Sequence, residues 1–226
     1  IINGDIPFQD YWLVSGLFID YLQAFFFKVF GQNFQVYIFH ASIINWLLTI
    51  ITFYILKNFN LNIYQCFLYS ICFATLGYTT SGTLYVDHHS SLLCLLAVFC
   101  LIMAIKTERR KFLILLPIIL GLAFLTKSAP SVYVFFSVSL ILILYILIEK
   151  KFNWLLYLFL SSISFIILTV LLFDIANIKL KNFFNQYIFF PSSIGKDRIA
   201  ELNFLSEGVI YDYKFIYISF LPLLIL

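Results

Sequence analysis

Three ionisable side chains stand together in an otherwise apolar part of the chain. The stretch LYVDHHSSLL holds Asp87, His88 and His89, directly before a long run of hydrophobic residues. A carboxylate in such a place can accept the proton of a reacting hydroxyl group, and a histidine can contact a phosphate or an acceptor. The alternative is purely structural, because Asp87 is suitably placed to accept hydrogen bonds from the first amides of a helix.

Two cations are candidates for holding a phosphate group. Lys127 lies in LGLAFLTKSAP, beside Pro130, between two apolar runs and far in sequence from any acidic residue. An ammonium at such a boundary is placed to meet the phosphate of a membrane lipid, although a lysine also extends to headgroups without any function. Arg198 in FFPSSIGKDRIAEL is the second candidate, and the adjacent Asp197 fits an ordinary solvated turn just as readily.

The metal-binding alternatives are weak. Adjacent histidines on a helix point about 100° apart, so that His88 and His89 do not easily share one ion. The four cysteines lie within apolar runs and form no close pair of the CxxC type, which favours free thiols. The sequence therefore names no metal ligands and disfavours zinc, and it leaves the use of a divalent cation open.

The composition indicates the kind of fold that must position these residues. Hydrophobic residues make up 63% of the 226 residues and charged residues only 11%, and the mean hydropathy is +1.01. These values are typical of a polytopic membrane protein. Because a membrane-spanning helix satisfies its own backbone hydrogen bonds, the predicted fold class is all-α. Seven apolar stretches are candidate spans, near 34–56, 61–77, 89–106, 112–126, 131–148, 153–173 and 213–226.

Several details of this bundle follow from the pattern of polar residues. The apolar stretch 112–149 is too long for one span, so the chain is expected to reverse at Lys127–Pro130. Residues 14–31 contain Asp20, Gln23 and Lys28, which fit a helix lying in the membrane interface better than a marginal span. The whole chain is interpreted as one transmembrane domain, incomplete at both ends, with outer loops at 1–33 and 174–212.

The basic residues predict the orientation. In the seven-span scheme, Lys57, the cluster KTERRK at 106–111, and the pair Lys150 and Lys151 fall on one side, which is therefore expected to be cytoplasmic. The short turns of the opposite side hold only Lys127. This bias accounts for the net charge of +3, so that nucleic acid need not be invoked as a partner.

Two longer stretches resemble a known family. GDIPFQDYWLVSGLFIDYLQAFFFKVFG, residues 4–31, is similar to the first outer loop of GT-C glycosyltransferases of the bacterial dolichyl-phosphate-mannose-transferase-like type. LGLAFLTKSAP at 120–130 is similar to another stretch of that family, and DHHS at the outer start of a helix fits it. The resemblance covers most of the chain, and the order, spacing and topology of the matches carry more weight than any single motif.

The resemblance implies an activity and a set of site residues. The expected reaction moves a sugar from a polyprenyl-phosphate donor to a lipid, glycan or protein acceptor, at the outer face of a bacterial inner membrane. Asp10, which matches an aspartate of the family, and Asp87 are the expected catalytic carboxylates. The expected substrate contacts are Lys127, His88, His89, Arg198 and Asp5. Many relatives carry an Asp-Glu pair soon after their first span, and residues 1–226 hold neither that pair nor that span. Some relatives use a divalent cation and others do not.

Other classes of function stay open at this point. A transporter or lipid flippase also places ionisable groups in membrane helices, but usually near the midplane. A non-catalytic subunit of an envelope-assembly complex would show the same pattern as an enzyme. The clustering of charged groups at one face favours the glycosyltransferase.

Overall fold

The computed structural model describes residues 1–76 and 86–194, which form helices joined by short connections. No β-strand occurs in this part of the chain, and the predicted all-α fold is confirmed. In chain order the elements are α1 (Leu17–Phe30), α2 (Phe34–Asn58), α3 (Ile63–Leu76), α4 (Val86–Thr107), α5 (Arg110–Thr126), α6 (Ser128–Glu149), α7 (Asn153–Ile175), α8 (Leu180–Phe183) and the π-helix η1 (Phe184–Phe189).

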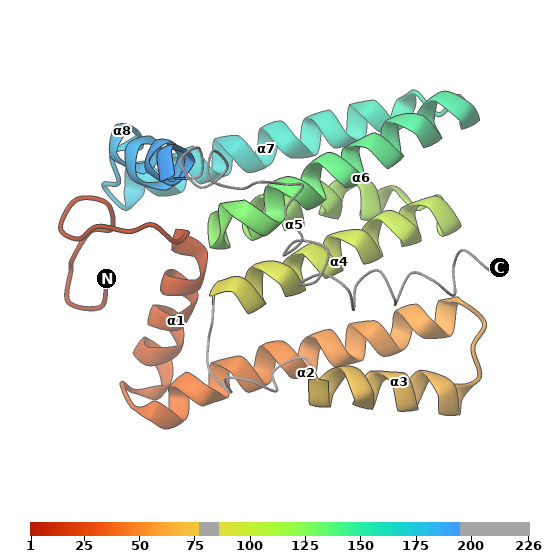
Figure 1. The fold of residues 1–226 in the computed structure, drawn as a ribbon, viewed down its shortest axis with the longest axis horizontal. Helices are drawn as coiled ribbons and strands as arrows, with labels where there is room; N and C mark the ends of the chain where they lie inside the picture. Colours follow the sequence, from red (N-terminus) through yellow and green to blue (C-terminus); the bar gives the residue numbers. More distant parts are fainter. Residues whose placement is uncertain (77–85, 195–226) are drawn as a thin grey trace, which may run out of the picture.

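Six of the seven predicted apolar stretches are helices, α2 to α7, which lie side by side along one direction (Figure 1). Four of them, α2, α4, α6 and α7, are long and apolar enough to cross a membrane. Helices α3 and α5 have 14 and 17 residues, and are thus shorter than the roughly 20 residues that a span needs. Within the described residues, four helices rather than seven therefore meet the criteria of a span, and the predicted stretch 213–226 lies outside these residues.

Helix α1 lies across one end of the bundle instead of running along it (Figure 1). It has 14 residues and is followed directly by Gly31, whose φ of 95° is easily adopted only by a residue without a Cβ atom. Two residues later the side chain of Asn33 accepts a hydrogen bond of 2.9 Å from the amide of Val36 and caps α2. This corner turns the chain from the crosswise helix into the first span, in agreement with the predicted interfacial helix.

The core of the bundle lies between α4, α5 and α6. Ala97 and Ala104 of α4 are fully buried, and they lie seven residues apart on one face of the helix. Small side chains at such positions let two helix backbones approach closely in a membrane, where packing drives helix association. On the other side of α5, Gly121 gives room to the ring of Phe165 from α7.

A second cluster joins the two ends of the described chain. Phe8, from the N-terminal arm at 1–16, packs edge-to-face against Phe183 of α8, with the ring centroids 5.5 Å apart. The fully buried Tyr187 of η1 also packs against Phe183 and donates its hydroxyl proton to the carbonyl of Phe124. The first half of the connection predicted at 174–212 is therefore largely helical, because its aromatic residues bury themselves against the arm and α5.

Candidate functional site

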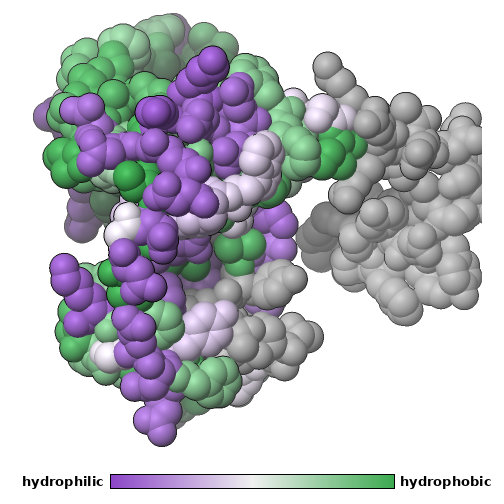
Figure 2. Space-filling view, turned by 90° about the vertical axis from the view of Figure 1, so that its left-hand side faces the viewer, coloured by the Kyte–Doolittle hydropathy of each residue, from purple (hydrophilic) through white to green (hydrophobic). Residues whose placement is uncertain are grey.

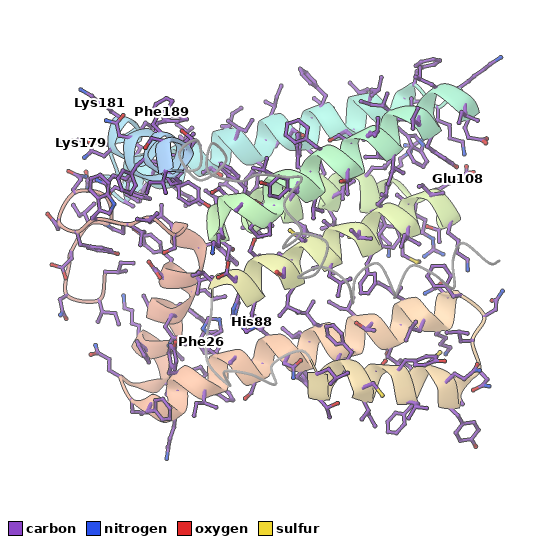
Figure 3. All side chains as sticks on the ribbon, viewed as in Figure 1. Phe26, His88, Glu108, Lys179, Lys181 and Phe189 are labelled. Atoms are coloured by element: carbon purple, nitrogen blue, oxygen red, sulfur yellow. The ribbon has the colours of Figure 1, made fainter. Side chains whose placement is uncertain are left out.

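The two ends of the bundle carry different charges. We call the end that carries α1 the crosswise end, and Figure 2, which looks onto it, shows hydrophilic residues gathered across it. Helices α2, α4 and α6 begin there, whereas α5 and α7 end there. Figure 3 places His88 at this end and Glu108 at the opposite one. Seven of the eleven lysines and arginines of the described residues lie in or next to the turns of the opposite end, namely Lys57, Lys106, Arg109, Arg110, Lys111, Lys150 and Lys151.

Asp87 and Lys127 form an ion pair at the crosswise end. Asp87 belongs to the first turn of α4, and Lys127 is the single residue between α5 and α6. The side chains are partly open to the surface, with relative exposures of 44% for Asp87 and 36% for Lys127. The chain does reverse at Lys127 as predicted, but the packing of α4 on α5 gives this lysine an acidic partner that its sequence neighbours do not supply.

Ser90 fixes the position of Lys127 relative to α4. Its side chain is fully buried, and its hydroxyl oxygen lies 3.3 Å from the carbonyl oxygen of Ala123 and 3.2 Å from that of Lys127. The hydroxyl of Ser131 donates to the same Lys127 carbonyl at 2.8 Å. These contacts hold the turn at Lys127 beside the first turn of α4.

The two predicted histidines take different positions. His88 is partly buried, whereas His89 is only 2% exposed and packs edge-on against His40 of α2, with the ring centroids 5.4 Å apart. His40 in turn stacks on Phe26 of α1 at 4.6 Å. Its Nδ1 atom lies 2.8 Å from Oε1 of Gln23, and the nitrogen must donate because an amide oxygen only accepts. His89 therefore helps to anchor α1 on α2 and α4.

The N-terminal carboxylates lie in a different part of the crosswise end. Asp10 accepts a hydrogen bond of 2.6 Å from the amide of Ile6 at its Oδ2 atom, which closes a turn of the arm. The arm packs on α8 and η1, whereas Asp87 packs beside α5. The structure thus brings Asp87 to Lys127, and it leaves Asp10 within its own turn.

A polar cavity of about 370 Å³ lies between the arm and α1. Its lining includes Asp5 and Tyr11 of the arm and Asp20 of α1. Burial raises the pKa of Asp20, and burial together with the nearby charge of Asp20 raises the pKa of Tyr11 to about 12. In the sequence, Asp20 indicates only that the helix lies in the membrane interface. Its spacing of three residues from Gln23 is a signal for a polar face of α1, whereas the other wall of the cavity is supplied by the arm.

Apolar grooves flank the contact between α5 and α7. The larger groove, of about 830 Å³, runs between these helices and reaches Leu17, Phe18 and Tyr21 of α1. The other, of about 530 Å³, lies between α5, α6, α7 and α8. Phe165 lines both grooves. Since the walls are largely apolar and α6 and α7 are long and apolar enough to cross a membrane, the occupants that the grooves suit are hydrocarbon chains.

Arg198 lies outside the described residues. Within 1–76 and 86–194, no three side chains of His, Cys, Asp or Glu come together as a metal site would require.

One comparison with known proteins gives a match. A family profile described as dolichyl-phosphate-mannose-protein mannosyltransferase matches residues 14–177, which is more than half of the chain. The matched part contains Asp20, Asp87 and Lys127, whereas Asp5 and Asp10 precede it. No curated protein and no solved structure matches the chain.

Proposed function

Because the chain belongs to the dolichyl-phosphate-mannose-protein mannosyltransferase family, we propose that it transfers a sugar from a polyprenyl-phosphate donor to the hydroxyl group of an acceptor. The reaction is placed at the crosswise end of the bundle. The observation that carries this placement is the ion pair of Asp87 with Lys127, which sets a potential base beside a potential phosphate ligand.

The chemistry needs one proton acceptor and one cation. The acceptor oxygen forms a bond to the anomeric carbon, and the bond between that carbon and the donor phosphate oxygen breaks. The carboxylate of Asp87 takes the acceptor's proton as general base. The departing phosphate changes from a diester to a monoester and gains negative charge, which the ammonium of Lys127 stabilises.

The ion pair itself must open for this reaction. Both side chains are partly exposed, and an exposed pair contributes only about 0–1 kcal/mol. A donor phosphate can therefore draw Lys127 away from Asp87 at little cost. The carboxylate is then released at the moment when the donor is in place.

The larger groove supplies a place for the polyprenyl chain. Leu125, which lines it, precedes Lys127 by two residues, so the groove leads toward the cation. Its walls are almost entirely apolar, with few polar contacts along their length, as an isoprenoid chain requires. Leu17 and Phe18 of α1 line its end near Lys127.

The remaining predicted residues are assigned by their positions. His88, partly buried beside Asp87, is proposed to contact the phosphate or the acceptor. Asp10 is proposed as a supporting contact through its Oδ1 atom, because Ile6 occupies Oδ2. Arg198 remains a proposed phosphate contact on sequence grounds. The basic residues of the opposite end favour a cytoplasmic location for that end, which supports the proposal that the reaction takes place on the outer face of a bacterial inner membrane.

The test is a transfer assay with purified full-length protein in liposomes that contain a polyprenyl-phosphate sugar. Asp87→Asn is expected to lower the turnover rate by a factor on the order of 10²–10⁴, as expected for a general base. Asp174→Asn, at the end of α7, is the matched control and should leave turnover close to the parent's. Normal turnover of the Asp87 variant would remove this residue from the mechanism, and no transfer by the parent from any such donor would overturn the function.

A further inference from the structure

We propose that the cavity between the N-terminal arm and α1 binds the hydroxyl groups of a sugar unit, and that the acceptor is therefore a glycan. This inference rests on the proposed function, since it names the acceptor of that reaction. It concerns residues other than the Asp87–Lys127 pair, so that the two can be tested separately.

The side chains that line the cavity are those that bind a neutral polyol. They include carboxylates, which accept hydrogen bonds, and amides and a phenol, which both donate and accept. These polar groups are Asn3, Asp5, Tyr11, Asp20, Gln23 and Gln32. No lysine or arginine side chain is part of this lining, and the carboxylates of Asp5 and Asp20 outnumber the terminal ammonium of Ile1, which argues against a phosphate as the occupant.

One face of α1 forms the floor of the cavity. Asp20, Gln23, Ala24 and Phe27 follow one another at the spacing of a single helical face. Ala24 leaves room between the two polar side chains, and Phe27 adds an apolar ring. A pocket that combines an aromatic surface with a few placed polar groups suits a sugar ring, which has C–H faces and hydroxyl edges. Its volume of about 370 Å³ lies at the lower end of ligand pockets.

The electrostatics of the cavity fit a neutral ligand. The hydroxyl of Tyr11, whose pKa burial raises to about 12, holds its proton and can donate it. Asp20 is a partly desolvated carboxylate, and burial raises its pKa. Such a carboxylate is stabilised when a ligand hydroxyl donates a hydrogen bond in place of the water that the carboxylate has lost.

Gln23 connects the cavity to the bundle. Its Oε1 atom accepts from His40, which fixes the amide plane, and its shielded Nε2 atom has no hydrogen-bond partner among the described residues. A ligand hydroxyl at this wall would satisfy the nitrogen after a small movement. A divalent cation is the less favoured occupant, because no three side chains of His, Cys, Asp or Glu come together among the described residues.

The test measures binding of soluble sugars to the full-length protein. The probes are methyl glycosides of hexoses, pentoses and N-acetylhexosamines, titrated up to about 50 mM and followed by saturation-transfer NMR. We expect at least one probe to bind, and we expect Ala24→Leu, which fills the floor, and Asp20→Asn each to weaken its binding by about tenfold or more. Val29→Leu, an exposed position of α1 outside the cavity, is the control and should bind as the parent does.

Donor binding provides the separate readout. The Ala24→Leu protein should bind a polyprenyl-phosphate sugar as well as the parent, because the cavity and the Asp87–Lys127 pair use different residues. If no probe binds the parent, or if Ala24→Leu binds the probe unchanged, the inference is overturned while the proposed function stands. A calcium titration that shows binding lost in Asp20→Asn, with no sugar bound, would also overturn it in favour of a cation site.

Discussion

The carboxylate of Asp87 meets the ammonium of Lys127 where the first turn of α4 lies beside the single residue that separates α5 from α6. The neighbouring Ser90 is fully buried and contacts the carbonyl of Lys127. The backbone of the pair is thus held firmly, while the two charged groups remain partly exposed. A rigid backbone with exposed charges is what a site needs if a substrate is to exchange with one partner of the pair.

A double-mutant cycle should separate stability from activity in this pair. Lys127→Met, Asp87→Asn and the double variant should each change the free energy of unfolding by no more than about 1 kcal/mol, because the pair is exposed. Lys127→Met should weaken donor binding roughly 10- to 150-fold, because it removes a charged contact with the phosphate. Thermal unfolding and donor titration of the purified protein measure the two effects.

Lys181→Met is the control for that titration, because Lys181 lies on α8 at the crosswise end (Figure 3) and makes no recorded ion pair among the described residues. Lys127→Arg should retain part of the donor affinity, since the charge remains while its geometry changes. Parental affinity in Lys127→Met would show that Lys127 only extends to the headgroups.

Gly16 should be indispensable for the docking of α1. Its amide donates a hydrogen bond of 2.9 Å to the carbonyl of Thr126, and a Cβ atom at this position would lie 1.8 Å from the carbonyl oxygen of Leu125. Because backbone atoms cannot yield as a side chain does, Gly16→Ala should destabilise the protein by about 1–3 kcal/mol. Thermal unfolding in detergent should show the loss, while Ser15→Ala, the neighbouring control, should unfold close to the parent.

Gly121 should tolerate alanine only if its neighbour shrinks. An added Cβ atom would approach the ring of Phe165 to 2.1 Å, so Gly121→Ala should push α7 away from α5 and lower stability. Combining it with Phe165→Leu should recover part of that loss, because a smaller side chain replaces the ring. A purely additive result for the two substitutions would mean that this contact does not hold the helices together.

The orientation can be checked with single cysteines in a cysteine-free protein. Ser193 lies at the crosswise end, and Arg109 lies in the turn between α4 and α5 at the opposite end, which is rich in basic residues. The two variants are Ser193→Cys and Arg109→Cys. In intact cells, a membrane-impermeant maleimide should label Cys at 193 and spare Cys at 109, since the basic end is expected in the cytoplasm. The reverse labelling would move the proposed reaction to the other face.

The sequence predicts the helices well, because membrane helices depend mainly on local apolar content. The stretch 34–56 corresponds to α2, which ends at Asn58, and 153–173 corresponds to α7, which ends at Ile175. The crosswise α1 was also recognisable, because Asp20, Gln23 and Lys28 oppose a span. The stretch 112–126 corresponds to α5, which begins two residues earlier, at Arg110, and ends at Thr126.

The candidate site was predictable only in part. Asp87 and Lys127 were each recognised by type, but their pairing depends on how α4 packs against α5, which no local pattern records. His89 was expected to contact the substrate, and its burial against His40 depends in the same way on the arrangement of α1, α2 and α4. The role of Asp20 requires a wall supplied by the arm, which sequence spacing alone does not reveal.

The buried carboxylate of Asp20 should make stability depend on pH in a specific direction. Burial raises its pKa in the folded protein above the ordinary value of 3.8. Below that value the carboxyl group is protonated in both the folded and the unfolded state, so its burial does not lower the free energy of unfolding. As the pH rises, the unfolded chain releases the proton first and the folded protein keeps it longer. The folded state therefore binds more protons in this range, and its stability falls with rising pH until the folded carboxyl has also ionised.

Asp20→Asn should remove this dependence while it impairs the cavity. The variant should be as stable as the parent at about pH 3.5 and more stable at pH 7, because it avoids the cost of a desolvated charge. Its binding of sugar probes should fall at the same time, so that stability and function change in opposite directions. Unfolding by denaturant at several pH values measures the effect, with Asp5→Asn, an exposed carboxylate of the same cavity, as the control. A stability difference that is constant between these pH values would mean that Asp20 ionises as freely in the folded protein as in the unfolded chain.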